Sequence, residues 1–125
     1  MTRRKKFNRL VEAKQIAKQL LIHRMWYGLS QTKVANVLDI TFQQYQKLER
    51  CENRVFAEQL LKICNEFNWC PRTILKADPV KMLDVWSQRR KAKTRPNINN
   101  TLDNIRNKLD KIDENAYKKY FRERN

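Results

Sequence analysis

One short segment of the chain gathers polar side chains that can hydrogen-bond to a ligand from one helical face. Taken as a helix, residues 42–50 direct outward the side chains of Gln43, Gln44, Gln46, Lys47 and Arg50. A glutamine amide can pair with adenine through two hydrogen bonds, whereas lysine and arginine favour the O6 and N7 atoms of guanine. A helix that faced only solvent would rarely collect three glutamines with no glutamate before its last turn. The pattern favours contact with base edges in DNA, and a solvated helix face is the alternative.

The spacing of apolar residues predicts the helices that would position this face. We expect helices over residues 8–27, 31–38, 42–50, 57–68, 71–77 and 79–91, then a linker over 94–100 and a last helix over 101–125. Ser30 and Thr41 are good N-caps, and Pro71 and Pro79 suit a first helical turn. One glycine in 125 residues argues against sheets joined by tight hairpins. The expected fold class is therefore all-α.

The second and third predicted helices have the apolar spacing of a helix-turn-helix. Ala35 provides a small residue where the two helices would cross, and Ile40 would fill the turn. The other inward positions are Val34, Leu38, Tyr45 and Leu48. Phe42, at the start of the third helix, either contacts a thymine methyl group or covers the core.

Three motifs around these helices occur in a characteristic order. They are Arg24-x-x-x-Gly28-Leu29-Ser30-Gln31, Thr41-Phe42-Gln43-Gln44-x-Gln46-Lys47-x-Glu49, and Asn53-Arg54. Together they resemble the Cro/repressor-type (Xre) helix-turn-helix family of bacterial and phage regulators, and the match covers roughly residues 10–77. The resemblance implies a five-helix, lambda-repressor-like domain whose third helix enters the DNA major groove.

The resemblance also implies roles for individual residues. Gln31 would clamp a backbone phosphate, and Asn53 and Arg54 would touch phosphates. Residues matching Phe42, Gln43, Gln44 and Lys47 would approach bases, and Arg24 would bridge to Glu49. The complete predicted DNA-binding set is Gln31, Thr41, Phe42, Gln43, Gln44, Gln46, Lys47, Arg50, Asn53 and Arg54.

Three residues depart from the family pattern. Asp39 occupies the usual glycine site in the turn, where aspartate tolerates the left-handed conformation better than most residues. Cys51 also replaces a usual glycine, at a cost of around 1 kcal/mol if its φ is positive. Phe56 stands where serine or threonine normally caps the fourth helix, and loss of that cap would cost ~1 kcal/mol. None of the three lies on the reading face.

The formal net charge of +15 is concentrated in two flanking segments. Residues 1–24 carry eight basic and one acidic residue, and residues 79–100 carry six basic and one acidic residue. We predict a basic N-terminal arm over 1–9, a DNA-binding domain over 10–78, a basic helix and linker over 79–100, and a C-terminal amphipathic helix over 101–125. The predicted phosphate contacts are Arg3, Arg4, Lys5, Lys6, Arg89 and Arg90. A solubilising tail is the alternative for the first four.

The last predicted helix carries a short heptad seam. Its apolar residues are Leu102, Ile105, Leu109, Ile112 and Ala116, spaced alternately by three and four. We expect this seam to reinforce a homodimer that reads two half-sites ~34 Å apart. The alternatives are that the helix folds back on its own domain or orders with a protein partner.

No catalytic constellation is recognisable in the sequence. There is no Ser/His/Asp set, glycine-rich phosphate loop or convergent carboxylate pair, and the single His23 has no partners at metal-ligand spacing. We therefore predict no enzyme, no metal and no cofactor. Three cysteines without a Cys-x-x-Cys pair fit a reduced cytoplasm, and the apolar runs are too short for a membrane span.

The sequence therefore predicts a sequence-specific, double-stranded DNA-binding transcriptional regulator that acts as a dimer in the cytoplasm, associated with the nucleoid. One alternative is an architectural nucleoid or DNA-packaging protein with little sequence preference. Another is an antitoxin-like DNA-binding adaptor with a protein partner at the C-terminal helix. RNA binding is less favoured because exposed aromatic residues do not alternate with basic ones.

Overall fold

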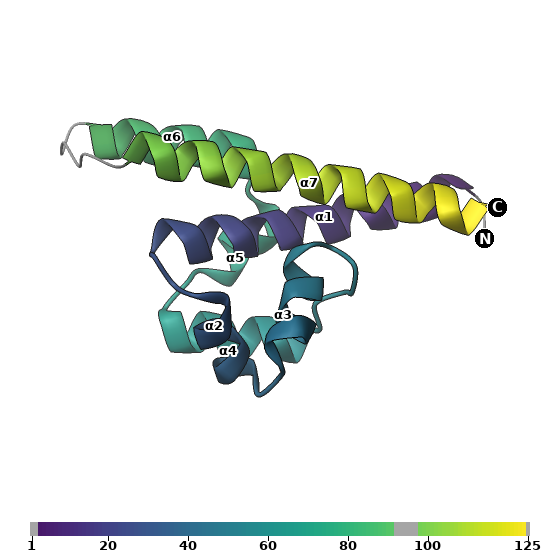
Figure 1. Ribbon diagram of the computed structural model, residues 1–125, viewed down its shortest axis with the longest axis horizontal. Helices are drawn as coiled ribbons and strands as arrows, with labels where there is room; N and C mark the ends of the chain where they lie inside the picture. Colours follow the sequence, from purple (N-terminus) through teal and green to yellow (C-terminus); the bar gives the residue numbers. More distant parts are fainter. Residues whose placement is uncertain (1–2, 92–97, 125) are drawn as a thin grey trace.

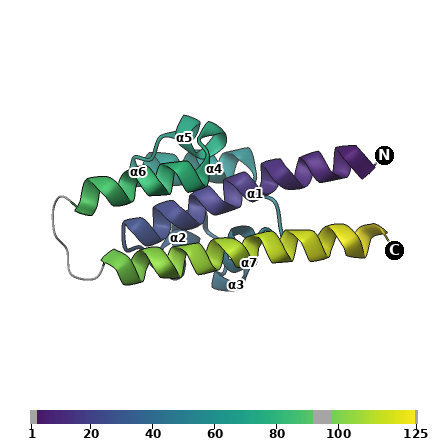
Figure 2. The same cartoon turned by 90° about the horizontal axis from the view of Figure 1, so that it is seen from above.

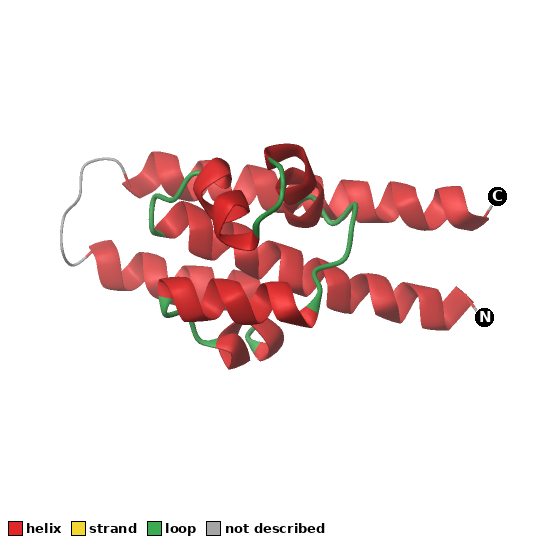
Figure 3. Ribbon diagram, turned by 90° about the horizontal axis from the view of Figure 1, so that it is seen from below, coloured by secondary structure: helices red, strands yellow, loops and turns green. Residues whose placement is uncertain are grey.

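The computed structural model describes residues 3–91 and 98–124, with side chains for residues 11–89, 101–115 and 118. Its helices are α1 (Arg3–Trp26), α2 (Gln31–Leu38), α3 (Phe42–Glu49), α4 (Ala57–Phe67), α5 (Pro71–Lys76), α6 (Pro79–Lys91) and α7 (Ile98–Arg124). The described part is helix and loop with no strand (Figure 3). The all-α prediction is confirmed.

The helix boundaries of α2 to α6 agree with the prediction to within one residue, whereas α1 and α7 are longer than expected. The segment predicted as an arm, residues 1–9, is helical from Arg3 onward. Residues 3–6 are all basic and give no apolar period from which a helix could be inferred. The start of α7 at Ile98 falls inside the predicted linker, and residues 94–97 of that linker lie outside the described residues.

The helices lie at three levels, with α1 in the centre. Figure 1 shows α6 and α7 above α1, and α2, α3 and α4 below it. In the perpendicular view of Figure 2, α7 runs beside α1 in the opposite direction. Helix α1 therefore packs against α6 and α7 on one side and against the helices of the α2–α4 layer on the other.

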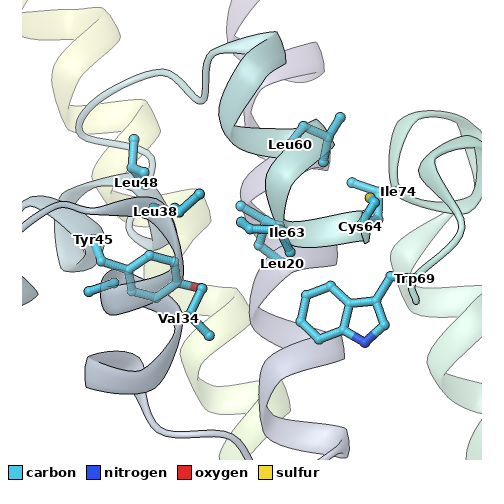
Figure 4. Packing of buried hydrophobic residues seen from close by; sticks show 11 residues of the cluster. Leu20, Val34, Leu38, Tyr45, Leu48, Leu60, Ile63, Cys64, Trp69 and Ile74 are labelled. Atoms are coloured by element: carbon cyan, nitrogen blue, oxygen red, sulfur yellow. The ribbon is translucent and has the colours of Figure 1, made fainter. Parts of the chain in front are cut away.

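The lower core joins α1 to α2, α3, α4 and α5. It is built from the inward positions of the apolar pattern, and its fully buried members include Leu20, Val34, Tyr45, Ile63 and Ile74 (Figure 4). Burial of such side chains stabilises the fold by about 1.5–3 kcal/mol each. This core fixes which face of α3 points outward.

The upper core joins α1 to α6 and α7. The seam residues Leu102, Ile105, Leu109 and Ile112 are each at most 5% exposed, and they pack with Ala17, Leu21, Ile22 and Leu83. Asp113 fixes the same packing from one side, with its carboxylate 3.2 Å from the Lys14 ammonium and 2.8 Å from that of Lys18. In the described residues, the seam of α7 is therefore covered by α1 of the same chain. This folding back is one of the alternatives to a dimer seam that the sequence leaves open.

The single histidine belongs to the packing around α1. The ring centroid of His23 lies 5.0 Å from that of Trp69 and 5.1 Å from that of Trp86. Its Nδ1 atom is 2.7 Å from the Gln19 carbonyl oxygen. Burial lowers the pKa of His23 below its ordinary value of 6.5, and the hydrogen bond to Gln19 opposes this shift without reversing it. His23 is therefore a buried, neutral side chain at pH 7.

We expect the stability of the protein to fall as the pH drops below about 6.5, the ordinary histidine pKa. Below that pH the unfolded chain takes up a proton at His23 that the folded chain binds less well. His23→Gln keeps a hydrogen-bond donor for the Gln19 carbonyl but cannot titrate, so its stability should depend less on pH between about 6.5 and 5. Urea unfolding across this range measures the difference. If the free energy of unfolding changed equally with pH in the wild type and in His23→Gln, the role of His23 would be contradicted.

Candidate nucleic-acid interface

A tight turn joins α2 to α3 and depends on one left-handed residue. Asp39 has a φ of 59°, and its N–H donates to the Asn36 carbonyl oxygen at 3.2 Å. The Ile40 N–H donates to the Ala35 carbonyl oxygen at 3.1 Å, and the Ile40 side chain packs on the lower core. Ala35 is 1% exposed. The turn expected at this site therefore forms with aspartate in place of glycine.

We expect Asp39→Gly to raise the free energy of unfolding by about 0.5–1 kcal/mol, because glycine adopts a positive φ without strain. The Asp39 side chain is exposed, so its removal costs little packing. Chemical denaturation measures the change. Asp39→Ala is the matched control and should be destabilising, because alanine has a Cβ and no polar group to stabilise the left-handed conformation. An Asp39→Gly protein that is less stable than the wild type would contradict this account.

The outward face of α3 begins at a reciprocal cap. The Thr41 hydroxyl oxygen accepts from the Gln44 N–H at 3.1 Å, and the Gln44 Oε1 atom accepts from the Thr41 N–H at 2.9 Å. Such a capping box satisfies two backbone donors that the helix itself leaves open. The Gln44 side chain is exposed, but its carbonyl oxygen is used to start the helix.

Two further predicted residues bind each other across the α2–α3 unit. The Gln46 Nε2 atom donates to the Gln31 Oε1 atom at 3.2 Å, and Gln31 in turn donates to Glu49 at 3.1 Å. By contrast, the side chains of Gln43 and Lys47 are exposed and make no hydrogen bond or ion pair with the described residues. Together with the exposed Arg50, they are the residues of the predicted outward face whose side chains make no hydrogen bond or ion pair with the described residues.

A buried ion pair holds α3 on α1. The Arg24 Nε and Nη2 atoms donate to the Glu49 carboxylate oxygens, both at 2.7 Å, and Nη1 donates to the Leu29 carbonyl oxygen at 3.0 Å. The side chains are 8% and 3% exposed. Burial alone would lower the pKa of Arg24, but the hydrogen bonds and charge of Glu49 raise it above its ordinary value. The bridge implied by the family resemblance is therefore present.

The loop after α3 is tied back to that helix. The N–H groups of Glu52 and Asn53 donate to the Lys47 carbonyl oxygen at 2.9 and 3.1 Å, and Cys51 has the positive φ, 62°, expected of a residue at a glycine site. Asn53 and Arg54 are exposed, and they border a hollow of about 140 Å³ next to the start of the described α1 side chains. The loop therefore holds both predicted phosphate-binding residues at the surface beside α3.

The fourth helix begins without a side-chain acceptor, as its sequence predicts. The Phe56 side chain is 65% exposed and cannot accept a hydrogen bond, so half of the usual cap is missing. The other half is present, because the Phe56 N–H donates to the Gln59 Oε1 atom at 2.9 Å.

The predicted basic flanks are not all near α3. Arg3, Arg4, Lys5 and Lys6 lie on α1, and their side chains are outside the described residues. Arg89 is exposed on α6, which lies on the opposite side of α1 from α3 (Figure 1). The Arg90 side chain is likewise not described. The structure therefore does not bring Arg89 together with the outward face of α3.

Sequence reasoning missed the contribution of α7 to this surface. Lys108, Lys111 and Asn115 line a hollow of about 180 Å³ together with Gln31, Gln46 and Arg50. The heptad spacing of residues 101–125 predicts a buried seam and indicates no role for the polar residues beside it. The signal is a helical projection of 101–115, which separates these lysines from Asp103, Asp110 and Asp113, although Glu114 lies next to Lys111.

The described part of the chain lacks metal-binding clusters and membrane-spanning helices. It contains no group of three or more His, Cys, Asp and Glu side chains that could hold a metal ion. None of the described helices combines the length and apolar character needed to cross a membrane. Comparisons of the chain with protein-family models, with curated proteins and with solved structures find no match.

Proposed function

We propose that this chain is a sequence-specific, double-stranded DNA-binding regulator of the Cro/repressor (Xre) type, in which α2 and α3 form a helix-turn-helix and α3 enters the major groove. The observation that carries the proposal is the outward face of α3, where the exposed side chains of Gln43 and Lys47 are not engaged within the described residues. Base reading requires such free donors and acceptors on a helix.

The anchoring of α3 supports the same proposal. Tyr45, Leu48 and Glu49 are buried, and the capping box at Thr41 fixes the first turn. A functional face presented by a rigid element positions its side chains more accurately than a loop would. Gln43 would pair with adenine and Lys47 with guanine, while Asn53 and Arg54 in the following loop would contact phosphates.

We further propose that the protein acts as a homodimer on two half-sites about 34 Å apart. The described α7 seam is covered by α1 of the same chain, so the dimer must use a different surface. Because α1 already buries this seam, an adaptor that binds a partner protein through the seam is disfavoured. Sedimentation of the whole chain tests the dimer: a monomer at concentrations that saturate DNA would remove it from the proposal.

The proposal is tested by fluorescence anisotropy with duplex DNA, single-stranded DNA and duplex RNA of one sequence. We expect the strongest binding to duplex DNA, because the major groove of A-form RNA is too narrow for a helix to read. The binding constant should fall linearly with salt on logarithmic axes, since phosphate contacts release counterions. Equal or tighter binding of duplex RNA would overturn the proposal.

Architectural DNA packaging is the second candidate, and one observation favours it. Gln44 and Gln46 each use part of their amide within the chain, which leaves fewer free base-reading groups than the sequence indicates. A packaging protein would weaken uniformly on all duplexes when Gln43 or Lys47 is replaced, whereas a regulator would lose its site preference.

A further inference from the structure

The hollow between α7 and the α2–α3 unit has the size and polarity of an anion site. Its volume of about 180 Å³ is well above the ~10–15 Å³ that one water molecule needs, so the hollow has room for a group with several oxygens, such as a phosphate. The side chains that line it include the amides of Gln31, Gln46 and Asn115 and the cations of Arg50, Lys108 and Lys111. Each of these six side chains has an N–H group that can donate a hydrogen bond.

Packing of α7 on α1 fixes where the two lysines lie. Each precedes a buried seam residue, since Leu109 follows Lys108 and Ile112 follows Lys111. With 3.6 residues per turn, positions three apart lie on one side of a helix, so both lysines occupy the same flank of the seam. Asp113 lies on the other flank, where it pairs with Lys14 and Lys18. The two lysines therefore lie on the flank away from Asp113, and this flank borders the hollow.

The positive charge at the hollow is not compensated within the described part of the chain. Glu49 is the one carboxylate among the lining residues, and Arg24 already binds both of its oxygens. The side chains of Arg50, Lys108 and Lys111 make no ion pair with a described residue, although Glu114 lies one turn from Lys111. Three cations that repel one another at the edge of a hollow are stabilised by a bound anion.

We propose that Lys108 and Lys111, together with Arg50, bind a backbone phosphate of the same DNA duplex whose bases α3 reads. This inference rests on the proposed function. Arg50 directly follows α3, and Gln46 lies on it, so an anion in the hollow lies beside the reading helix. An extended polyanion can reach this hollow and the outward face of α3 together, whereas a free phosphate can occupy only one of them. In this interface α7 is a third DNA-contacting element, and its packing on α1 keeps its lysines next to α3.

The test is the salt dependence of duplex binding by Lys108→Ala/Lys111→Ala. Each lost phosphate contact lowers the logarithmic salt slope by about 0.9, which at 0.1 M salt is about an eightfold loss of affinity. Because the three cations share one phosphate, we expect the double variant to bind up to about eightfold more weakly, with a slope lower by up to about 0.9. The loss should be the same on a preferred site and on random duplex DNA, because phosphate contacts carry no direct sequence information.

Two matched variants separate a local contact from the loss of net charge. Lys76→Ala/Lys81→Ala removes two exposed lysines from α5 and α6 and should leave the salt slope unchanged. Lys108→Arg/Lys111→Arg should retain wild-type slope and affinity, since arginine also binds phosphate. Thermal unfolding checks that each variant is folded.

The outcomes distinguish this inference from the proposed function. A wild-type slope for Lys108→Ala/Lys111→Ala, or an equal loss in the Lys76/Lys81 control, would overturn the α7 contact and leave DNA binding intact. A wild-type protein that fails to bind duplex DNA would overturn the proposed function, and the inference would fail with it.

Discussion

Replacement of Arg24 with methionine is expected to lower the free energy of unfolding by about 3–5 kcal/mol, the usual cost of leaving a buried charge without its partner. The Glu49 side chain is 3% exposed and receives two hydrogen bonds of 2.7 Å from Arg24. Methionine has a similar length but no donor, so Glu49 would lose its cationic partner and keep hydrogen bonds only with the neutral Gln31 and Tyr45 side chains among the described residues. Urea unfolding measures the loss.

The double variant Arg24→Met/Glu49→Leu should recover much of this loss, because it removes both buried charges at once. The surface pair of Arg106 and Asp84 is a natural control: its atoms are 3.5 Å apart and its side chains are 52% and 56% exposed. Arg106→Met should cost less than about 1 kcal/mol. If Arg24→Met cost no more than Arg106→Met, the bridge would not anchor α3.

The second large effect concerns sequence discrimination by α3. Lys47→Ala and Gln43→Ala should each lower the preference for a specific site over random duplex DNA by about 5- to 150-fold, because one good pair with a base contributes about 1–3 kcal/mol of discrimination. Both side chains are exposed, and alanine is a strong helix former, so the fold should be retained. Competition binding with specific and random duplexes measures the preference.

Lys62→Ala is the matched control for Lys47→Ala, because Lys62 is an exposed lysine on α4. It should leave the preference unchanged. Uniform weakening of both duplexes by Lys47→Ala and Gln43→Ala, without a change in their ratio, would favour the packaging protein over the regulator.

The sequence was sufficient to predict α2, α3, α5 and α6 because their starts carry local signals, whereas α4, which lacks a side-chain acceptor at its start, was predicted from the helical spacing of its apolar residues. Ser30, Thr41 and Asp78 accept from backbone N–H groups at the helix starts, and the left-handed Asp39 ends α2. These signals depend on residues within one helical turn and can be read without knowledge of the tertiary structure.

The position of α7 could not be predicted in the same way. An apolar seam is stabilised by burial whether the covering surface belongs to its own chain or to another, because the hydrophobic effect is non-directional. The pattern of Leu102, Ile105, Leu109 and Ile112 therefore predicts a buried face but not its partner, which the structure identifies as α1. The hollow bordered by Lys108 and Lys111 depends on this packing and was missed for the same reason.

The sequence predicts which residues form the candidate site, but not which of their side chains are already hydrogen-bonded within the chain. Helical spacing places Gln43, Gln44, Gln46 and Lys47 on one outward face, but it does not indicate which amides are already engaged. Gln44 belongs to the cap of α3, and Gln46 binds Gln31, 15 positions earlier in the chain. Such long-range hydrogen bonds depend on the crossing of α2 and α3, so the sequence overstated the number of free base-reading groups.

Selection of bound duplexes from a random library, with RNA present as competitor, measures whether α3 reads specific base pairs in duplex DNA. We expect an enriched, palindromic motif for the wild-type protein, with half-sites about one helical turn apart, and loss of that enrichment for Lys47→Ala. Recovery of duplexes with no enriched motif would contradict this role of α3.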